Sequence, residues 1–348
     1  MLRGGREETI KIGAILPLTG VGERIGIEAR DGMLLAVDGI NSRKGINGRK
    51  IQLIFEDSKT DPQEGKRAFH RIEKTHRPLF YVSVLSTISM AVASLSEENR
   101  VVLFGIITAT TVFTKKKEWV FRYYHTAELD ARSLLSILQE LRVKNLGIIY
   151  INDEYGVSVL ERVRKEFQAK GGIIRSESFK TREVDYKGQI EKLKDLEAIC
   201  FIGFVPHIQK AFKQLRKADY DGIILSAAGA CDPVITNMPE ANGVYVSAPI
   251  IFDPDYLYAR GAKERYEAKY NKPFNMFAAS NYDFLICIAG LLKDKKISRE
   301  NLRVVLEQGF MYPGVFGFLD VKPGEHEINF PLHPARIVDG KLQYLHLH

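Results

Sequence analysis

The feature that most constrains this chain is a regular alternation of short apolar runs with amphipathic segments of helical spacing. Ile10–Leu16 has the pattern of a strand, and apolar residues then recur at helical spacing from Ile27 to Ile40. The predicted strands are 10–16, 51–55, 79–84, 101–105, 146–151, 172–176, 198–203 and 222–225. The predicted helices are about 27–40, 62–76, 87–98, 129–141, 157–170, 187–193 and 208–217.

This order predicts the α/β fold class. Repeated strand–helix units form parallel sheets that are covered by helices on both faces. A second series of units begins near residue 126, and 348 residues suffice for two domains of ordinary size. We therefore expect two doubly wound, parallel-sheet lobes.

The fold class also predicts where function lies. In doubly wound folds, ligands bind beyond the carboxyl ends of the strands, in the loops that enter the following helices. The loops at that position are 18–25, 85–87, 106–111, 152–156, 204–207 and 226–231.

Composition excludes several classes of protein. The net charge is +7, but the basic residues are interleaved with acidic ones, and runs such as 115–117 are typical of solvated faces. No nucleic-acid-binding motif accompanies them, so no nucleic-acid partner is expected. The apolar run at 284–292 is shorter than the roughly 20 residues that a membrane span needs. Cys200 and Cys287 lie in apolar runs and are expected in the core.

No catalytic or metal-binding motif is present in the sequence. A G-x-S-x-G elbow, an H-E-x-x-H helix and a phosphate-binding P-loop are all missing, so we expect no enzyme, no cofactor and no metal. The strongest enzyme alternative is a dinucleotide site formed by the glycines of 20–26, with Glu56 and Asp57 ending the second strand. The glycine spacing is G-x-G-x-x-x-G rather than G-x-G-x-x-G, which argues against a dehydrogenase.

Several segments, in order along the chain, resemble the type I periplasmic binding proteins of the leucine/isoleucine/valine-binding group. These segments are IKIGAILPLTG at 10–20, GINGRKI at 45–51, ED at 56–57, TDP at 60–62, DEYG at 153–156, NYD at 281–283 and VDGK at 338–341. Each motif is weak alone, whereas their common order and spacing make a specific signal. The resemblance covers nearly the whole chain.

The resemblance implies two lobes joined by a three-segment hinge. Lobe one is then about 8–125 plus 253–327, and lobe two about 126–252 plus 328–348. It also implies a non-catalytic receptor that captures a small organic acid or amino-acid-like ligand between its lobes and delivers it to the permease of an ABC importer. A ligand-sensing domain that docks with a regulator is the alternative within the same fold.

The cellular location follows from the resemblance alone. The first residues contain no apolar signal-peptide region, which by itself leaves the cytoplasm and an exported mature form equally open. The resemblance implies a periplasmic or extracellular protein, with lipid anchoring as one option.

In lobe one the resemblance points to two ligand-binding loops. Ser86 would bind a ligand carboxylate at the start of a helix, whereas its other interpretation is a helix-capping hydroxyl. Ile107, Thr108, Ala109 and Thr110 match a loop that supplies a backbone carbonyl and a threonine hydroxyl. Ala109 takes the threonine position here, so Thr108 or Thr110 would substitute, and a turn bonded by its own hydroxyls is the other interpretation.

In lobe two it points to Tyr155, Phe204 and Ala228. Tyr155 would reach the ligand, although a half-buried packing tyrosine is the alternative. Phe204 offers a ring where the family often has tyrosine. Ala228 stands where amino-acid binders place an acidic side chain, and Asp232 follows four residues later. A buried ammonium group without an anionic partner is costly. We therefore expect a carboxylate ligand without an α-amino group.

Overall fold

The computed structural model describes residues 9–110, 112–253 and 255–345. The chain divides by its contacts into two compact units, and only their described residues are discussed below. Unit 1 is Met1–Thr108, Val112–Tyr124 and Leu257–Phe330, and unit 2 is Ala109–Thr111, His125–Tyr256 and Pro331–His348. Thr111 of the predicted loop 106–111 lies outside the described residues, as do residue 8 and residues 346–348 of the predicted lobes.

Unit 1 contains a parallel sheet of six strands within the described residues, in the order β13-β5-β4-β3-β1-β2. Its strands are β1 (Ile10–Leu16), β2 (Ile51–Asp57), β3 (Phe80–Val84), β4 (Val102–Ile106), β5 (Val120–Tyr123) and β13 (Glu327–Ile328). Its helices are α1 (Glu23–Ser42), α2 (Pro62–His76), α3 (Ser86–Asn99), α9 (Leu257–Tyr270), α10 (Met276–Leu291) and α11 (Arg299–Glu307). A separate antiparallel hairpin joins β11 (Phe310–Gly314) to β12 (Gly317–Val321).

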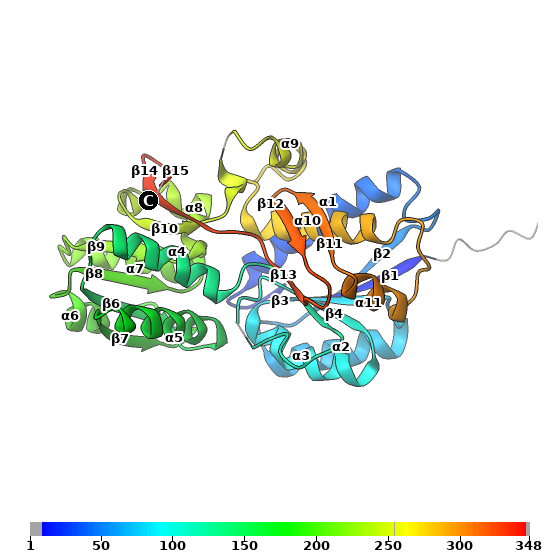
Figure 1. The fold of residues 1–348 in the computed structure, drawn as a ribbon, viewed down its shortest axis with the longest axis horizontal. Coiled ribbons are helices and arrows are strands. Elements are labelled where there is room, and N and C mark those ends of the chain that lie inside the picture. Colours follow the sequence, from blue (N-terminus) through cyan, green and yellow to red (C-terminus); the bar gives the residue numbers. More distant parts are fainter. Residues whose placement is uncertain (1–8, 111, 254, 346–348) are drawn as a thin grey trace, which may run out of the picture. The chain divides into compact units, whose positions relative to one another are not determined.

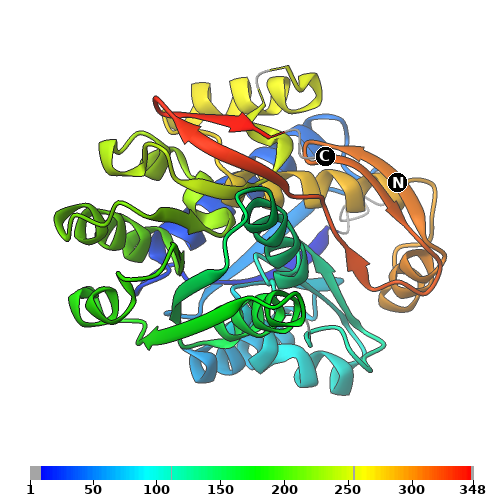
Figure 2. The ribbon, with the colours of Figure 1, turned by 60° about the vertical axis from the view of Figure 1, so that its left-hand side comes forward.

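Alternating residues of β3 show that helices cover both faces of this sheet. Phe80 packs against Phe284 of α10, with ring centroids 5.9 Å apart. The next residue, Tyr81, stacks on Phe69 of α2 at 4.3 Å. Figures 1 and 2 show α2 and α3 on one side of the strands, with α1 and α10 on the other. This is the doubly wound arrangement that the sequence predicts.

Unit 2 contains a sheet of seven strands within the described residues, in the order β15-β14-β10-β9-β8-β6-β7. The strands are β6 (Asn145–Ile151), β7 (Ile173–Phe179), β8 (Ala198–Ile202), β9 (Ile223–Ser226), β10 (Tyr245–Ala248), β14 (His333–Val338) and β15 (Lys341–Tyr344). The helices are α4 (Ala127–Glu140), α5 (Glu154–Ala169), α6 (Lys187–Leu193), α7 (Val205–Lys217) and α8 (Pro233–Thr236). Short 3₁₀ turns are η1 (Ala228–Cys231), η2 (Pro239–Ala241) and η3 (Ile250–Phe252).

Strand β8 shows the same two-faced packing in unit 2. Cys200 and Ile202 belong to a buried cluster with apolar residues of α4 and α5. Between them, Phe201 points to the other face, where its ring packs at 5.0 Å from Tyr186, which immediately precedes α6. The strands from β7 to β10 are parallel, and β14 and β15 add to the edge as antiparallel strands.

The predicted fold class is confirmed, with differences at particular elements. Strand β5 has no counterpart among the predicted strands, because its four residues include the charged Arg122. Helix α5 begins at Glu154 rather than 157, since Asp153 caps it. Helix α7 begins at Val205 rather than 208, because Pro206 fits the first turn of a helix. The expected core positions of Cys200 and Cys287 are confirmed, as both are buried.

Candidate functional site

Two predicted loops of unit 1 follow the neighbouring strands β3 and β4 and contain strained backbone. Leu85, between β3 and α3, has φ of 79°, and Ile107, just after β4, has φ of 57°. Positive φ is unfavourable for such side chains, and it is a true outlier for a β-branched residue such as isoleucine. They are the two aliphatic residues with positive φ among the described residues. Strain of this kind gathers at ligand sites, where the surroundings hold it in place.

Ser86 lies in the first turn of α3 and is buried, with 5% of its surface exposed. The residue that precedes the helix, Leu85, occupies the N-cap position, and its side chain makes no capping hydrogen bond. The structure therefore does not place Ser86 in the capping position of the alternative interpretation. Its role toward a ligand stays a prediction.

Thr108 is anchored inside unit 1. Its side chain is fully buried, and its Oγ1 lies 2.7 Å from Oγ of Ser89, which in turn accepts a hydrogen bond from Ser83 Oγ at 2.7 Å. The Thr108 carbonyl accepts a hydrogen bond from Nη1 of Arg122 at 2.7 Å. Thr108 thus has the self-bonded environment of the alternative interpretation, and the ligand role of Thr108 or Thr110 stays a prediction.

Ala109 and Thr110 belong to unit 2, although the residues on either side belong to unit 1. The Ala109 carbonyl accepts a hydrogen bond from the Ala127 amide at 2.7 Å. Thr110 Oγ1 lies 3.0 Å from Oγ of Ser158 on α5. The loop tip is therefore tied to the helices that begin after β5 and β6.

Tyr155 lies in the first turn of α5, where it is half-buried and packs against the core cluster of unit 2. The carboxylate of Asp153 accepts hydrogen bonds from the amides of Tyr155 and Gly156, at 3.1 and 2.9 Å. Burial raises the pKa of Asp153 to about 6, even though these two hydrogen bonds act to lower it. Asp153 belongs to the predicted DEYG motif but was not predicted as a site residue. Its two hydrogen bonds fix the backbone at Tyr155 and Gly156.

Phe204 is the N-cap residue of α7 and is half-buried. Its amide donates to Nδ1 of His207 at 3.2 Å, and Nε2 of His207 lies 2.8 Å from the carbonyl oxygen of Thr181. These contacts require a neutral imidazole that carries its proton on Nε2. Burial lowers the pKa of His207, which favours this neutral form. His207 was not predicted as a site residue, and it sets the position of Phe204.

Ala228 begins the turn η1 after β9 and is buried. Its amide donates to Oδ1 of Asp130 at 3.0 Å, and Oδ2 of the same carboxylate lies 3.0 Å from Nε2 of His125. Both Asp130 oxygens therefore have partners inside unit 2. Asp232 is the N-cap residue of α8, and its Oδ1 accepts a hydrogen bond from the Val234 amide at 2.9 Å.

Apart from Ala109 and Thr110, which follow β4 but belong to unit 2, the predicted residues lie at one edge of the sheet of their own unit. In unit 1, Ser86, Ile107 and Thr108 follow the neighbouring strands β3 and β4. In unit 2, the loops with Tyr155, Phe204 and Ala228 follow β6, β8 and β9, which are neighbours in that order. Three residues that support these loops were not predicted from the sequence: Asp130, His125 and His207.

The dinucleotide alternative conflicts with the contacts of Asp57. Its Oδ1 accepts hydrogen bonds from the amides of Leu18, Thr19 and Lys59, and its Oδ2 accepts one from the Thr19 hydroxyl at 2.6 Å. Burial alone would raise the pKa of Asp57, but these hydrogen bonds together lower it. The carboxylate is engaged in holding the loop after β1, whereas a ribose-binding acid must face a ligand. Glu56 is paired with Arg71.

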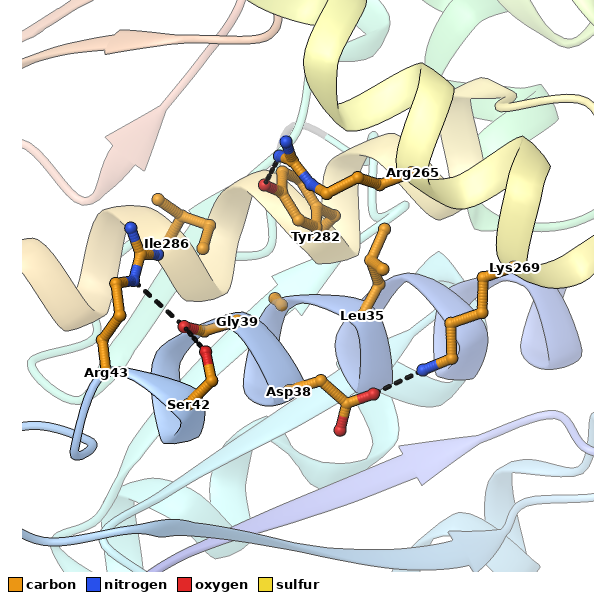
Figure 3. Close-up of a pocket in the computed structure, with 10 residues that line it drawn as sticks. Leu35, Asp38, Gly39, Ser42, Arg43, Arg265, Lys269, Tyr282 and Ile286 are labelled. Atoms are coloured by element: carbon orange, nitrogen blue, oxygen red, sulfur yellow. Dashed lines mark hydrogen bonds and ion pairs between the residues drawn. The ribbon is translucent and has the colours of Figure 1, made fainter.

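A separate hollow of about 540 Å³ lies within unit 1 between α1, α9 and α10 (Figure 3). Arg265 donates to the Tyr282 hydroxyl at 2.9 Å on its rim, and Lys269 pairs with Asp38. The hollow contains none of the predicted site residues.

Across the described ranges, no three His, Cys, Asp or Glu side chains gather closely enough to hold a metal ion.

None of the helices in the described part of the chain is both long and apolar enough to cross a bilayer.

Two doubly wound units, joined where the chain passes between them after Tyr124, Tyr256 and Phe330, define the type I architecture of solute-binding proteins. The short excursion at 109–111 is an additional passage. The chain belongs to the periplasmic binding protein family, whose model matches residues 9–341. This match, together with the relatives described next, confirms the resemblance to the leucine/isoleucine/valine-binding group.

Individual relatives are distant in sequence but similar in structure. The leucine-, isoleucine-, valine-, threonine- and alanine-binding protein of Pseudomonas aeruginosa is 21% identical over 289 residues, which cover 81% of this chain and 77% of that protein. The branched-chain amino acid binding protein of Streptococcus pneumoniae, solved with isoleucine, superposes with a TM-score of 0.86 at 22% identity, covering 97% of this chain and 98% of that chain. A solute-binding protein of Rhodopseudomonas palustris, solved with 3,4-dihydroxybenzoic acid, gives 0.86 at 17% identity, covering 97% and 96%.

Proposed function

We propose that this chain is an extracytoplasmic receptor that binds a small organic acid, without turning it over, and delivers it to an ABC importer. The observation that carries the proposal is the strained backbone at Leu85 and Ile107, in the two unit 1 loops where the family binds its solute. Holding an aliphatic residue at positive φ costs free energy, and such strain clusters at ligand-binding and active sites.

The ligand's carboxylate would bind at the start of α3. A helix N-terminus exposes backbone amides and the positive end of the helix dipole, which together favour an anion. Ser86 lies in that first turn, and the N-cap residue Leu85 makes no side-chain capping hydrogen bond to the helix. We assign Ser86, Ile107 and Thr110 to the polar end of the ligand, with the Ala109 backbone beside them. Thr108 would support them from within unit 1.

In unit 2 the proposal assigns Tyr155 and Phe204 to the ligand's apolar body, next to the backbone at Ala228. We also propose that the protein closes over its ligand by a hinge motion of two lobes. Lobe one is about 8–125 plus 253–327, and lobe two is about 126–252 plus 328–348. Motion about short connecting segments is the usual way in which such receptors respond to ligands.

The ligand class follows from the acids near Ala228. A receptor for amino acids needs an anion for the ammonium group, because a buried and unpaired ammonium costs several kcal/mol. Asp130 uses both oxygens for Ala228 and His125, and Asp232 accepts from the Val234 amide. These contacts support a ligand with a carboxylate but no α-amino group, such as a branched aliphatic or aromatic acid. The R. palustris protein, which was solved with 3,4-dihydroxybenzoic acid, is a structurally similar receptor whose ligand is an aromatic acid without an amino group, and this supports the proposal.

A thermal-shift screen tests the proposal. Branched aliphatic and aromatic acids should raise the melting temperature by an amount that grows with ligand concentration, as mass action requires. Incubation with a stabilising acid, with and without NAD(P)H, should leave that acid chemically unchanged. Catalytic turnover of the acid, or the lack of stabilisation by any small carboxylate, would contradict the proposal.

A further inference from the structure

Arg122 on β5 is a buried cation that the proposed ligand contacts do not use. Its side chain is 0% exposed. The Nε atom lies 2.6 Å from Oε2 of Glu327, and Nη2 donates to Oε1 of the same carboxylate at 3.3 Å. Nη1 donates to the carbonyl oxygen of Thr108 at 2.7 Å. A guanidinium stays charged in a protein, so both interactions are charge-assisted and stronger than neutral hydrogen bonds.

The contacts of Arg122 and Glu327 involve residues on both sides of the short segment 109–111, which is assigned to unit 2. Thr108 is the last residue before the excursion, and Phe113 and Thr114 follow closely after it. The Phe113 ring centroid lies 5.9 Å from the guanidinium carbon of Arg122. The Thr114 hydroxyl donates to Oε1 of Glu327, the oxygen that also faces Arg122. We call Arg122, Glu327, Thr108 and Thr114 the Arg122 clamp.

The clamp also reaches the start of α3. Thr108 Oγ1 bonds to Ser89 Oγ, and Ser89 lies in the same first helical turns as Ser86. One buried arginine is therefore connected, through Thr108, to both predicted ligand loops of unit 1. Between the clamp and β4 lies Ile107, whose positive φ must be maintained by its neighbours.

We infer that Arg122 is a positioning residue: it holds Thr108, and through it the strained loop at Ile107 and the Ser86 turn, in the arrangement that binds solute. It does so without touching the solute. The inference rests on the proposed function for its link to binding, but the mechanical part of it can be tested on the protein without ligand.

Arg299 provides a matched control in the same unit. It pairs with Glu73 through both Nη atoms, at 3.0 and 2.8 Å, and its Nε donates to the Pro78 carbonyl at 2.9 Å. Arg299 thus resembles Arg122 in pairing with one glutamate and donating to backbone carbonyls, here those of Pro78 and, at 3.5 Å, Asn99. Arg299 contacts neither predicted ligand loop, so it reports the general cost of losing such an arginine.

Hydrogen exchange on the ligand-free chain is the deciding experiment. Arg122→Met should speed exchange of the amides in 106–110 and 112–115 by about tenfold or more relative to Arg299→Met, because local opening loses its charged hydrogen bonds. Equal exchange of these amides in the two variants would overturn the inference. If Arg122→Met does not fold, Arg122→Lys replaces it, since one ammonium keeps the charge near Glu327 but cannot bond Thr108 as well. Arg299→Lys is then the control.

Binding of 4-methyl-2-oxopentanoate supplies the functional readout. We expect the Kd to rise about tenfold in the folded Arg122 variant and less than about twofold in its Arg299 counterpart, in line with loss of a charged contact that positions the loop. An unchanged Kd in the Arg122 variant would contradict the inference. Failure of the unaltered protein to bind this acid would instead contradict the proposed ligand class, and the exchange result would still decide whether the clamp exists.

Discussion

Tyr123 donates its hydroxyl hydrogen to Oδ2 of Asp283 across 2.7 Å, and this joins β5 to α10 inside unit 1. The same carboxylate accepts from the Tyr312 hydroxyl at 2.6 Å and from the Val315 amide at 3.1 Å. Burial raises the pKa of Asp283, while these donors act to lower it. The strand that carries Arg122 is thus fixed to its neighbours by a second buried polar group.

Tyr123→Phe should lower the free energy of unfolding by about 1–2 kcal/mol, because it removes one hydrogen bond to a buried acidic group. Urea unfolding, followed by circular dichroism, measures the loss. Tyr344→Phe is the control for the same loss in unit 2, since Tyr344 donates to the Pro249 carbonyl at 2.7 Å. A Tyr123→Phe protein as stable as the unaltered chain would show that Asp283 does not depend on this donor.

Ser86→Ala should weaken binding of a small carboxylate by about 1–3 kcal/mol, the usual value of a hydrogen bond to a charged group. Its stability should change little, because Ser86 is not the capping residue of α3. Calorimetric titration and denaturant unfolding separate the two effects. Ser96→Ala, near the other end of the same helix, should lose stability and keep its affinity. A Ser86→Ala protein that loses stability but not affinity would favour a structural role.

How much of this could be predicted from sequence depends on the element. Apart from β5, the strand–helix order up to β9 follows from apolar periodicity, because β1, β3, β4, β6 and β8 are largely buried apolar runs that alternate with helical spacing. Strand β5 was not predicted because the charged Arg122 interrupts its apolar pattern. Arg122 is buried through an ion pair with Glu327, a residue far away in the sequence. The contact between Asp130 and the Ala228 amide could not be predicted for the same reason, because the two residues are far apart in the sequence and meet only in the folded unit.

The contacts of Phe204 predict a pH dependence of binding. Protonation of His207 at Nδ1 removes the acceptor of the Phe204 amide. Because the pKa of His207 is lowered in the fold, the stability it contributes is present above its unfolded pKa and is lost as pH falls through the folded pKa. Affinity for a branched or aromatic acid should therefore fall as the pH drops below the ordinary pKa of histidine, about 6.5.

His207→Gln should remove most of that dependence when titrations are repeated across the range. His333 is the control, since burial also lowers its pKa but it lies on β14, away from Phe204. His333→Gln should keep the dependence. If both variants behave like the unaltered protein, His207 does not control Phe204.

The raised pKa of Asp153 predicts a pH dependence of stability that is opposite in sign to that of His207. Its pKa is raised to about 6, so the stability it contributes is fully present below its unfolded pKa and is lost as pH rises through about 6. Asp153→Asn keeps an N-cap acceptor without the buried charge. The variant should therefore be more stable than the unaltered chain near pH 8, by about 1–3 kcal/mol.

Denaturant unfolding at pH 5 and pH 8 measures this difference. Asp61→Asn changes an exposed N-cap on α2, whose carboxylate accepts from the Glu64 amide at 2.8 Å, and serves as the control. It should show no comparable gain at pH 8. A stability loss in Asp153→Asn at pH 8 would mean that the charged form of Asp153 is favoured by its hydrogen bonds.

If the chain is a receptor for a small acid without an α-amino group, as we propose, it must distinguish such an acid from the corresponding amino acid. Leucine and its 2-oxo analogue, 4-methyl-2-oxopentanoate, differ only at the carbon that bears the amino group. Calorimetric titration of each, and of one in the presence of the other, gives the ratio of their dissociation constants. We predict tighter binding of the 2-oxo acid, because Asp130 already bonds Ala228 and His125, and Asp232 accepts a hydrogen bond from the Val234 amide. Tighter binding of leucine would contradict it and would assign Asp232 or Asp130 as the partner of that group.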